Sequence, residues 1–181
     1  MRRLVLAAVV LALTASAGSA ALQRGKQAPA FTAKDVAGKA VKLSDFKGKK
    51  HVLLMFWSTT CPVSTGDLRP LAALQEKFKG KPLAILGVNT EKIAASLLSQ
   101  WSKEQKVPFR VVRDADRAIC KRYQATATPV YYLISKDGTV QSVYTNGGQG
   151  VIDVLTEDVA ELLRTGKIRA QREPKGPVTF G

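Results

Sequence analysis

The sequence predicts an α/β fold in which helices flank a central mixed β-sheet. The run at residues 52–57 is apolar on consecutive residues, which is typical of a strand covered on both faces. Downstream, short apolar runs alternate with helical periodicity, as expected for crossovers between parallel strands. A glycine turn at residues 136–138 joins two later strands into an antiparallel pair. Parallel and antiparallel neighbours together make the predicted sheet mixed.

The predicted domain starts with a β-hairpin at residues 31–43, whose turn centres on Gly38. After the strand at 52–57, apolar residues at helical spacing predict a helix over residues 61–78, with a kink at Pro70. The remaining elements are expected in the order strand 83–88, helix 91–106, strand 109–112, helix 114–123, strands 130–134 and 140–144, and helix 151–163.

Three side chains in these elements have a predicted environment. Leu97 falls on the inward stripe of helix 91–106. Asp114 is expected to be the N-cap of the next helix. His51, the only histidine, lies among lysines and is expected at the surface.

The two ends of the chain are expected to lie outside the folded domain, which spans residues 27–166. Residues 1–21 are predicted to be a secretory signal peptide, because Arg2 and Arg3 precede a short apolar core and a series of small residues. That core is shorter than the roughly 20 residues that span a bilayer, which disfavours the alternative of an uncleaved anchor. Export to the periplasm or the extracellular space follows. Residues 167–181 are basic and lack a core-forming pattern, so we expect a mobile tail.

The chain is strongly basic, with 28 Lys and Arg against 14 Asp and Glu and a formal net charge of +14. Such an excess suits nucleic acid, an anionic membrane or an acidic partner. The charges are spread along the whole chain, however, and no aromatic residues are interleaved with them for base stacking. We therefore expect a solvated basic surface and no nucleic-acid partner.

Cys61 is the leading candidate for chemistry. It follows a buried strand and opens a helix, where free N–H groups and the helix dipole favour a thiolate. Hydroxyl residues surround it in the sequence at Ser58, Thr60 and Ser64, and Ser64 is placed to hydrogen-bond the thiolate. Ser64 also stands where a two-cysteine motif would carry its second sulfur. The alternative is a buried cysteine that only fills space.

Cys120 is the only other cysteine, and its position allows two interpretations. It lies beside Ile119 on a predicted helix, which favours a place in the core. As a functional residue, it would resolve a disulfide formed at Cys61, provided that the two sulfurs approach each other. With His51 as the only histidine, the sequence offers no ligand set for a metal, and no cofactor is expected.

Three segments of the chain resemble one protein family. Residues 31–35 with 41–49 resemble the opening of the redoxin family, which includes alkyl hydroperoxide reductases and thiol-specific antioxidant proteins. Residues 56–62 resemble the active-site entry of exported thioredoxin-like thiol–disulfide oxidoreductases. Residues 128–138 resemble their cis-proline loop and final hairpin. The segments occur in the family's order, and the resemblance implies a thioredoxin fold over about residues 27–164.

The resemblance also implies roles for individual residues. Cys61 is the nucleophile of the thioredoxin-like branch, and the substrate site is expected to be lined by Thr128, Pro129 and Trp57. That branch usually carries a second cysteine three residues after the first, where this chain has Ser64. The usual cycle within one helical turn is therefore incomplete.

The peroxidase branch of the same family is the alternative. Its reactive cysteine follows a hydroxyl residue three positions earlier, and Ser58 fits that requirement. Its activating arginine, however, falls where this chain has Pro129. A cis-proline and that arginine compete for one place, so the proline favours the thioredoxin-like branch. The alternative sources of an activating arginine are Arg110, Arg113 and Arg117, and the sequence does not single out any of them.

Three functional hypotheses follow. In the first, an exported thiol–disulfide oxidoreductase forms a mixed disulfide between Cys61 and a protein or small-molecule substrate, which Cys120 or an external thiol reductant releases. In the second, a thiol peroxidase reacts with a peroxide and Cys61 becomes a sulfenic acid. In the third, a binding module keeps the fold without turnover.

Overall fold

The computed structural model describes residues 22–175 of the 181-residue chain. The predicted signal peptide, residues 1–21, lies outside this described part, as do residues 176–181 of the predicted tail. Within residues 22–175, no helix is long and apolar enough to cross a membrane.

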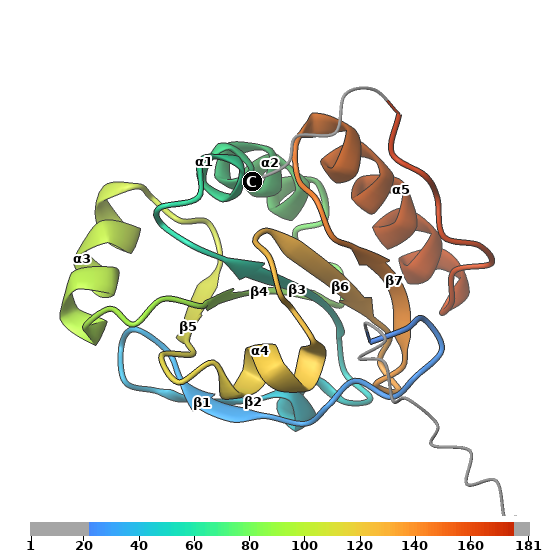
Figure 1. The fold of residues 1–181 in the computed structure, drawn as a ribbon. Helices are drawn as coiled ribbons and strands as arrows, with labels where there is room; N and C mark the ends of the chain where they lie inside the picture. Colours follow the sequence, from blue (N-terminus) through green and yellow to red (C-terminus); the bar gives the residue numbers. More distant parts are fainter. Residues whose placement is uncertain (1–21, 176–181) are drawn as a thin grey trace, which may run out of the picture.

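A five-stranded mixed sheet forms the centre of the fold, in the order β5–β4–β3–β6–β7 (Figure 1). The central strand β3 (His51–Trp57) lies parallel to β4 (Leu83–Asn89) and antiparallel to β6 (Val130–Ile134). On the parallel side the sheet ends with β5 (Arg110–Arg113), and on the antiparallel side with β7 (Val140–Tyr144). The predicted mixed sheet is confirmed.

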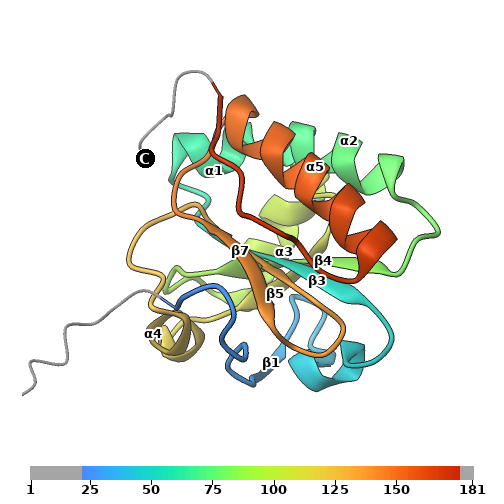
Figure 2. The ribbon, with the colours of Figure 1, turned by 90° about the vertical axis from the view of Figure 1, so that its right-hand side faces the viewer.

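Both faces of β3 are buried, which explains its uninterrupted apolar run. One face packs against α2 (Leu68–Lys77), α3 (Ala95–Glu104) and α5 (Gln149–Thr165), and the other against α4 (Ala118–Tyr123) and the N-terminal hairpin. Figure 2 shows α2 and α5 on one side of the sheet and α4 on the other. The first core takes Leu53, Met55 and Trp57 from β3, and the second takes Val52, Leu54 and Phe56. Since each buried large side chain contributes about 1.5–3 kcal/mol, β3 anchors both layers.

The predicted N-terminal hairpin is present as β1 (Thr32–Lys34) and β2 (Ala40–Lys42), which form a separate two-stranded sheet. The Asp35 carboxylate accepts two backbone N–H groups of the turn, at 2.8 and 3.0 Å. Gly38 has a φ of 79°, a left-handed conformation that glycine adopts without strain. The 3₁₀ turn η1 (Leu43–Phe46) then leads towards β3.

The helix predicted over residues 61–78 is broken into α1 (Pro62–Gly66) and α2, which meet at Asp67. Pro70 explains the break, because its ring clashes with the carbonyl of Gly66, four residues earlier, in a continuous helix. The predicted kink is therefore confirmed, displaced towards the N-terminus.

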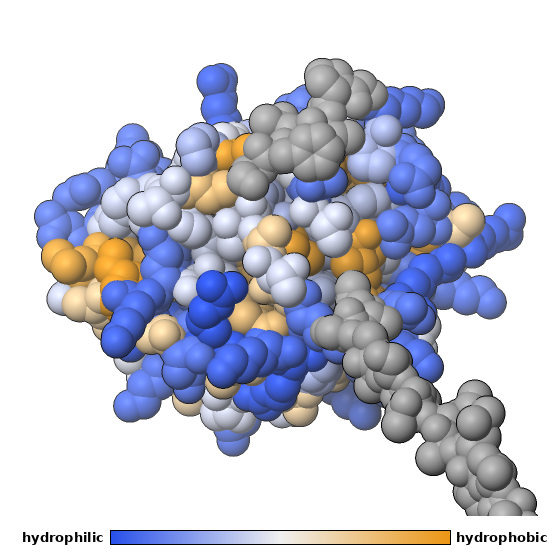
Figure 3. All heavy atoms as spheres, viewed as in Figure 1, coloured by the Kyte–Doolittle hydropathy of each residue, from blue (hydrophilic) through white to orange (hydrophobic). Residues whose placement is uncertain are grey.

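Two predicted side-chain environments are wrong. Leu97, predicted to face inward, is 57% exposed, because the inward stripe of α3 runs through Leu98 and Ser102 instead. Figure 3 shows an apolar patch over α3. His51, predicted at the surface, is 4% exposed, because it is the first residue of the central strand and pairs with Leu83.

Residues 167–175 pack against the domain, which differs from the mobile tail expected from Lys167 onwards. Ile168 is 3% exposed and joins the first core. Arg172 pairs with three carboxylates of α5, and the Gln171 amide bonds both backbone groups of Val143 on edge strand β7. The α5 carboxylates are apart from the tail in sequence, so the composition of the tail alone does not reveal this contact.

Candidate active site

Cys61 lies just beyond the C-terminal end of β3, at the N-cap of α1. Pro62 takes the first position of α1, where the missing N–H costs nothing. The backbone N–H of Ser64 points at Cys61 Sγ at 3.4 Å, and the thiol faces the carbonyl oxygen of Thr128 at 3.3 Å. Because Cys61 is partly exposed, a substrate can reach the sulfur.

The surroundings of Cys61 favour its thiolate. Burial by itself raises the pKa of Cys61, but interactions with the side chain and backbone of Ser64 outweigh burial and hold this pKa below its ordinary value. The Ser64 hydroxyl is completely buried and makes no standard hydrogen bond within residues 22–175, yet it lies close enough to the sulfur to lower the thiol's pKa. The predicted interaction between Ser64 and the thiolate is thus consistent with the geometry.

The loop before β6 forms the wall opposite the sulfur. The Thr128–Pro129 peptide bond is cis, as the resemblance implies, and Thr128 is partly exposed beside Cys61. Gly147 packs closely against this loop and against α1. A Cβ atom there would come within 2.7 Å of Pro129 Cγ and 2.6 Å of Val63 Cγ1, so only glycine permits this packing.

Asp67 is a buried carboxyl beneath this wall that the sequence pattern does not single out. It is 2% exposed, and its Oδ2 accepts a hydrogen bond of 2.5 Å from the Tyr131 hydroxyl. The backbone N–H of Gly148 donates to Oδ1 at 2.9 Å. Burial raises the pKa of Asp67 despite these hydrogen bonds, which makes the carboxyl able to hold a proton closer to neutral pH than an exposed aspartate.

The loop that carries the nucleophile is held by Glu91, which the sequence reasoning missed. Its carboxylate accepts the Thr59 N–H at 2.8 Å, the Thr59 hydroxyl at 3.0 Å and the Asn89 amide at 2.8 Å. Burial alone would raise the pKa of Glu91, but these hydrogen bonds lower it. An acidic residue just after β4, at the edge where parallel β3 also ends, is the signal that points to this role.

Ser58 and Thr60, predicted beside the sulfur, bond to each other instead. Their hydroxyl oxygens lie 2.8 Å apart, and the Thr60 N–H donates to Ser58 Oγ at 3.1 Å. Both side chains therefore shape the loop before Cys61, and neither makes a hydrogen bond to Cys61 Sγ within residues 22–175.

Trp57, predicted both to pack in the core and to line the substrate site, packs in the core. It is completely buried, and its ring packs against Trp101 at 5.5 Å and Phe109 at 6.3 Å between centroids. The alternation of β3 turns this side chain inward towards α3, and its burial does not favour the predicted contact with substrate.

Cys120 lies on α4, on the opposite side of the sheet from α1 (Figures 1 and 2). It is 2% exposed, and burial together with the Asp114 carboxylate raises its pKa to about 12. Asp114 is not the N-cap, because α4 begins only at Ala118; its carboxylate still accepts the N–H groups of Ile119 and Cys120, at 3.0 and 2.8 Å. Both cysteines are free, so the structure does not bring the two sulfurs together.

Within residues 22–175, no three His, Cys, Asp or Glu side chains gather in a way that would hold a metal ion. The described site thus consists of Cys61 with Ser64, the Thr128–Pro129 loop, the buried Asp67 and the loop held by Glu91.

The model of the AhpC/TSA family matches residues 24–143. The chain belongs to this family. It is 32% identical over 153 residues to the thiol-disulfide oxidoreductase ResA of Bacillus subtilis, an alignment that covers 83% of this chain and 82% of ResA. It is 28% identical over 132 residues to peroxiredoxin Q of Oryza sativa subsp. japonica, over 69% of this chain and 60% of that protein.

A solved structure agrees with this membership. The thioredoxin domain of a thiol-disulfide oxidoreductase from Bacteroides vulgatus matches with a TM-score of 0.69 at 27% identity, over 78% of this chain and 99% of that one. The fold is therefore the predicted thioredoxin fold with an N-terminal hairpin, in a superfamily of thiol-dependent oxidoreductases.

Proposed function

We propose that this chain is an exported thiol–disulfide oxidoreductase that acts through Cys61. The observation that carries the proposal is the 3.3 Å contact between Cys61 Sγ and the Thr128 carbonyl, beside cis-Pro129. The lowered pKa of Cys61 supports a reactive thiolate, and ResA, a relative, is named a thiol-disulfide oxidoreductase. Export rests on the signal peptide predicted at residues 1–21.

In the proposed reaction, the Cys61 thiolate attacks one sulfur of a substrate disulfide. The substrate S–S bond breaks as the new S–S bond to Cys61 forms, and the electron pair leaves on the second substrate sulfur, which takes a proton from water. One substrate sulfur is thereby reduced, and the other is held in a mixed disulfide. Thr128 and Pro129 flank the sulfur and would align the substrate chain alongside it.

Release of the mixed disulfide requires a second thiol. Ser64 stands at the position of the usual resolving cysteine and cannot form an S–S bond. Cys120 is buried in the opposite core with a pKa of about 12, so at neutral pH only about one part in 10⁵ is thiolate. We therefore assign resolution to an external thiol, which attacks the Cys61 sulfur and returns the chain to its reduced state.

A thiol peroxidase is the second candidate, favoured by the similarity to peroxiredoxin Q. It needs an arginine beside the sulfur, where this chain has Pro129. Two of the arginines that could take this role are engaged elsewhere: Arg110 pairs with Asp35 at 2.6 Å, and Arg113 donates to the carbonyl of Ile93 at 2.5 Å. These contacts favour disulfide exchange over peroxide reduction.

One experiment separates the candidates. The reduced protein is treated with stoichiometric hydrogen peroxide or with a peptide disulfide, and both cysteines are mapped by peptide mass, with Cys61→Ser and Cys120→Ser variants in parallel. A mixed disulfide at Cys61 that persists until an external thiol is added supports the proposal. A fast sulfenic acid at Cys61 supports the peroxidase. No reaction at Cys61 under either treatment leaves only the non-catalytic binding module.

A further inference from the structure

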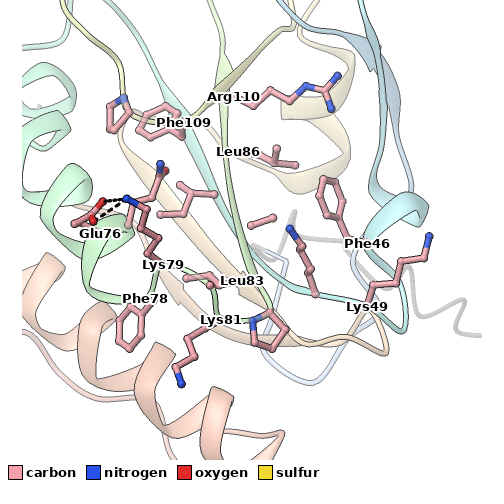
Figure 4. A pocket seen from close by; sticks show the side chains of 17 residues that line it. Phe46, Lys49, Glu76, Phe78, Lys79, Lys81, Leu83, Leu86, Phe109 and Arg110 are labelled. Atoms are coloured by element: carbon pink, nitrogen blue, oxygen red, sulfur yellow. Dashed lines mark hydrogen bonds and ion pairs between the residues drawn. The ribbon is translucent and has the colours of Figure 1, made fainter.

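A basic groove lies at the end of the sheet opposite Cys61. It encloses about 790 Å³ where β4 begins, between the end of α2 and the loop before β5 (Figure 4). The groove is lined by the first residues of β4, from Leu83, which pairs with His51 at the start of β3. Cys61 lies beyond Trp57, at the other end of β3, so the groove and the thiol belong to opposite ends of the sheet. A molecule bound in the groove therefore leaves the sulfur accessible.

Cations dominate the lining of this groove. Among residues 22–175, the lining includes one carboxylate, that of Glu76, and five cationic side chains. The cations are Lys49, Lys50, Lys79, Lys81 and Arg110. Lys79 pairs with Glu76 at 3.0 Å, and Arg110 pairs with Asp35. The other three lysines are exposed and form no ion pair within residues 22–175. Their charge is not explained by contacts in the described fold.

The positive surface continues into a neighbouring hollow of about 280 Å³, which shares Phe46 and Lys50 with the groove. Lys47 and Lys136 join its lining, which includes no aspartate or glutamate from residues 22–175. Cations gathered in this way repel one another over the Debye length of about 8 Å at physiological salt. An anionic partner would relieve that repulsion.

Part of the groove's lining is apolar, which decides the kind of anion that fits. Leu86 and Phe109 are 2% and 8% exposed and belong to the cores on the two faces of the sheet, and the partly buried Phe46, Phe78 and Leu83 line the groove together with the lysines (Figure 4). A flat membrane surface would meet the exposed lysines without reaching these recessed apolar side chains. A protein segment, by contrast, can insert an apolar side chain between its carboxylates.

We propose that this groove docks an acidic protein segment that carries an apolar side chain. The proposal does not depend on the reaction at Cys61. It adds a place where a partner is held while the thiol stays free, which raises the effective concentration of any disulfide on the same partner.

Charge reversal tests the proposal. The probe is a fluorescent peptide of glutamates around a Leu-Phe pair, and the test variant is Lys49→Glu/Lys50→Glu/Lys81→Glu. The matched control reverses three exposed lysines outside the groove, Lys103→Glu/Lys121→Glu/Lys167→Glu, so both variants carry the same net charge. Circular dichroism and the rate of Cys61 with a chromogenic disulfide verify that both variants fold.

We expect the groove variant to bind the peptide at least about tenfold more weakly than the unmodified protein, and the control variant to lose less than about twofold. Binding to the unmodified protein should weaken as the salt concentration rises. A peptide with glycines in place of Leu-Phe should bind several-fold more weakly. Equal losses in the two variants, or no binding at low salt, would overturn the proposal. So would anionic phosphatidylglycerol vesicles that bind through the groove lysines more tightly than the peptide does.

Discussion

Cys61 and Cys120 are the same side chain at the starts of two helices, yet the pKa of one is lowered and that of the other is raised to about 12. At α1 the free N–H of Ser64 points at the sulfur. At α4 the free N–H groups bond the Asp114 carboxylate, which adds a negative charge beside a buried thiol. A helix N-terminus therefore does not activate a cysteine by itself; the group that receives its N–H bonds does.

Substitution of the two cysteines should have very different effects on the rate of turnover. Cys61→Ser should lower the rate of disulfide exchange at least about a hundredfold, because a hydroxyl is not a nucleophile for sulfur at neutral pH. Cys120→Ser should keep the rate within about twofold, since its sulfur lies in the opposite core. The measurement is reduction of a peptide disulfide with an external thiol in excess. Equal losses in both variants would mean that Cys120 takes part in the cycle.

Removal of the Asp114 carboxylate tests whether this group raises the pKa of Cys120 and holds the start of α4. Asp114→Ala leaves two buried N–H groups at the start of α4 without their acceptor and should destabilise the fold by about 1–3 kcal/mol, measured by urea unfolding. It should also lower the pKa of Cys120. The control is Asp116→Ala, which removes an exposed carboxylate that accepts the Ala118 N–H. A control as destabilised as the test variant would contradict this role of Asp114.

Ser64→Ala tests whether the Ser64 hydroxyl lowers the pKa of Cys61. Loss of the buried hydroxyl should raise the pKa of Cys61 and slow its reaction with a chromogenic disulfide at pH 7 by about twofold to tenfold, the worth of one hydrogen bond. Thr65→Ala is the neighbouring control, because the Thr65 hydroxyl donates to the Pro62 carbonyl and not to the sulfur. An unchanged rate profile in Ser64→Ala would show that the backbone N–H alone stabilises the thiolate.

The two cysteines should also differ in how they affect stability at alkaline pH. A raised folded-state pKa means that Cys120 supports the fold below the ordinary thiol pKa and that this support is lost as pH rises towards about 12. Cys61 has the opposite sign: its thiolate supports the fold above the ordinary pKa, and that support is lost as pH falls. Between about pH 8 and pH 10, the free energy of unfolding of Cys120→Ser should therefore fall less steeply than that of the unmodified protein. A steeper fall for Cys120→Ser would contradict a raised pKa of Cys120 in the folded protein.

The sequence predicts the sheet and the position of Cys61 well, because apolar periodicity and the strand-to-helix switch at Pro62 are local signals. It does not predict contacts that depend on which segments the fold brings together. Glu91 and Asp67 reach the site only through the ends of β4 and α1, and Trp57 turns away from the site because of strand alternation. His51 is buried for the same non-local reason, since it pairs with the start of a neighbouring strand.

Of the two cysteines, we expect only Cys61 to be a reactive thiolate in the folded chain. The decisive measurement is the rate at which iodoacetamide alkylates each cysteine as a function of pH, read by peptide mass in one sample. Cys61 should react with a midpoint below the ordinary thiol pKa of about 8.5, while Cys120 should stay unmodified until the protein unfolds. Alkylation of folded Cys120 at a rate comparable to Cys61, or a Cys61 midpoint above the ordinary value, would contradict this expectation.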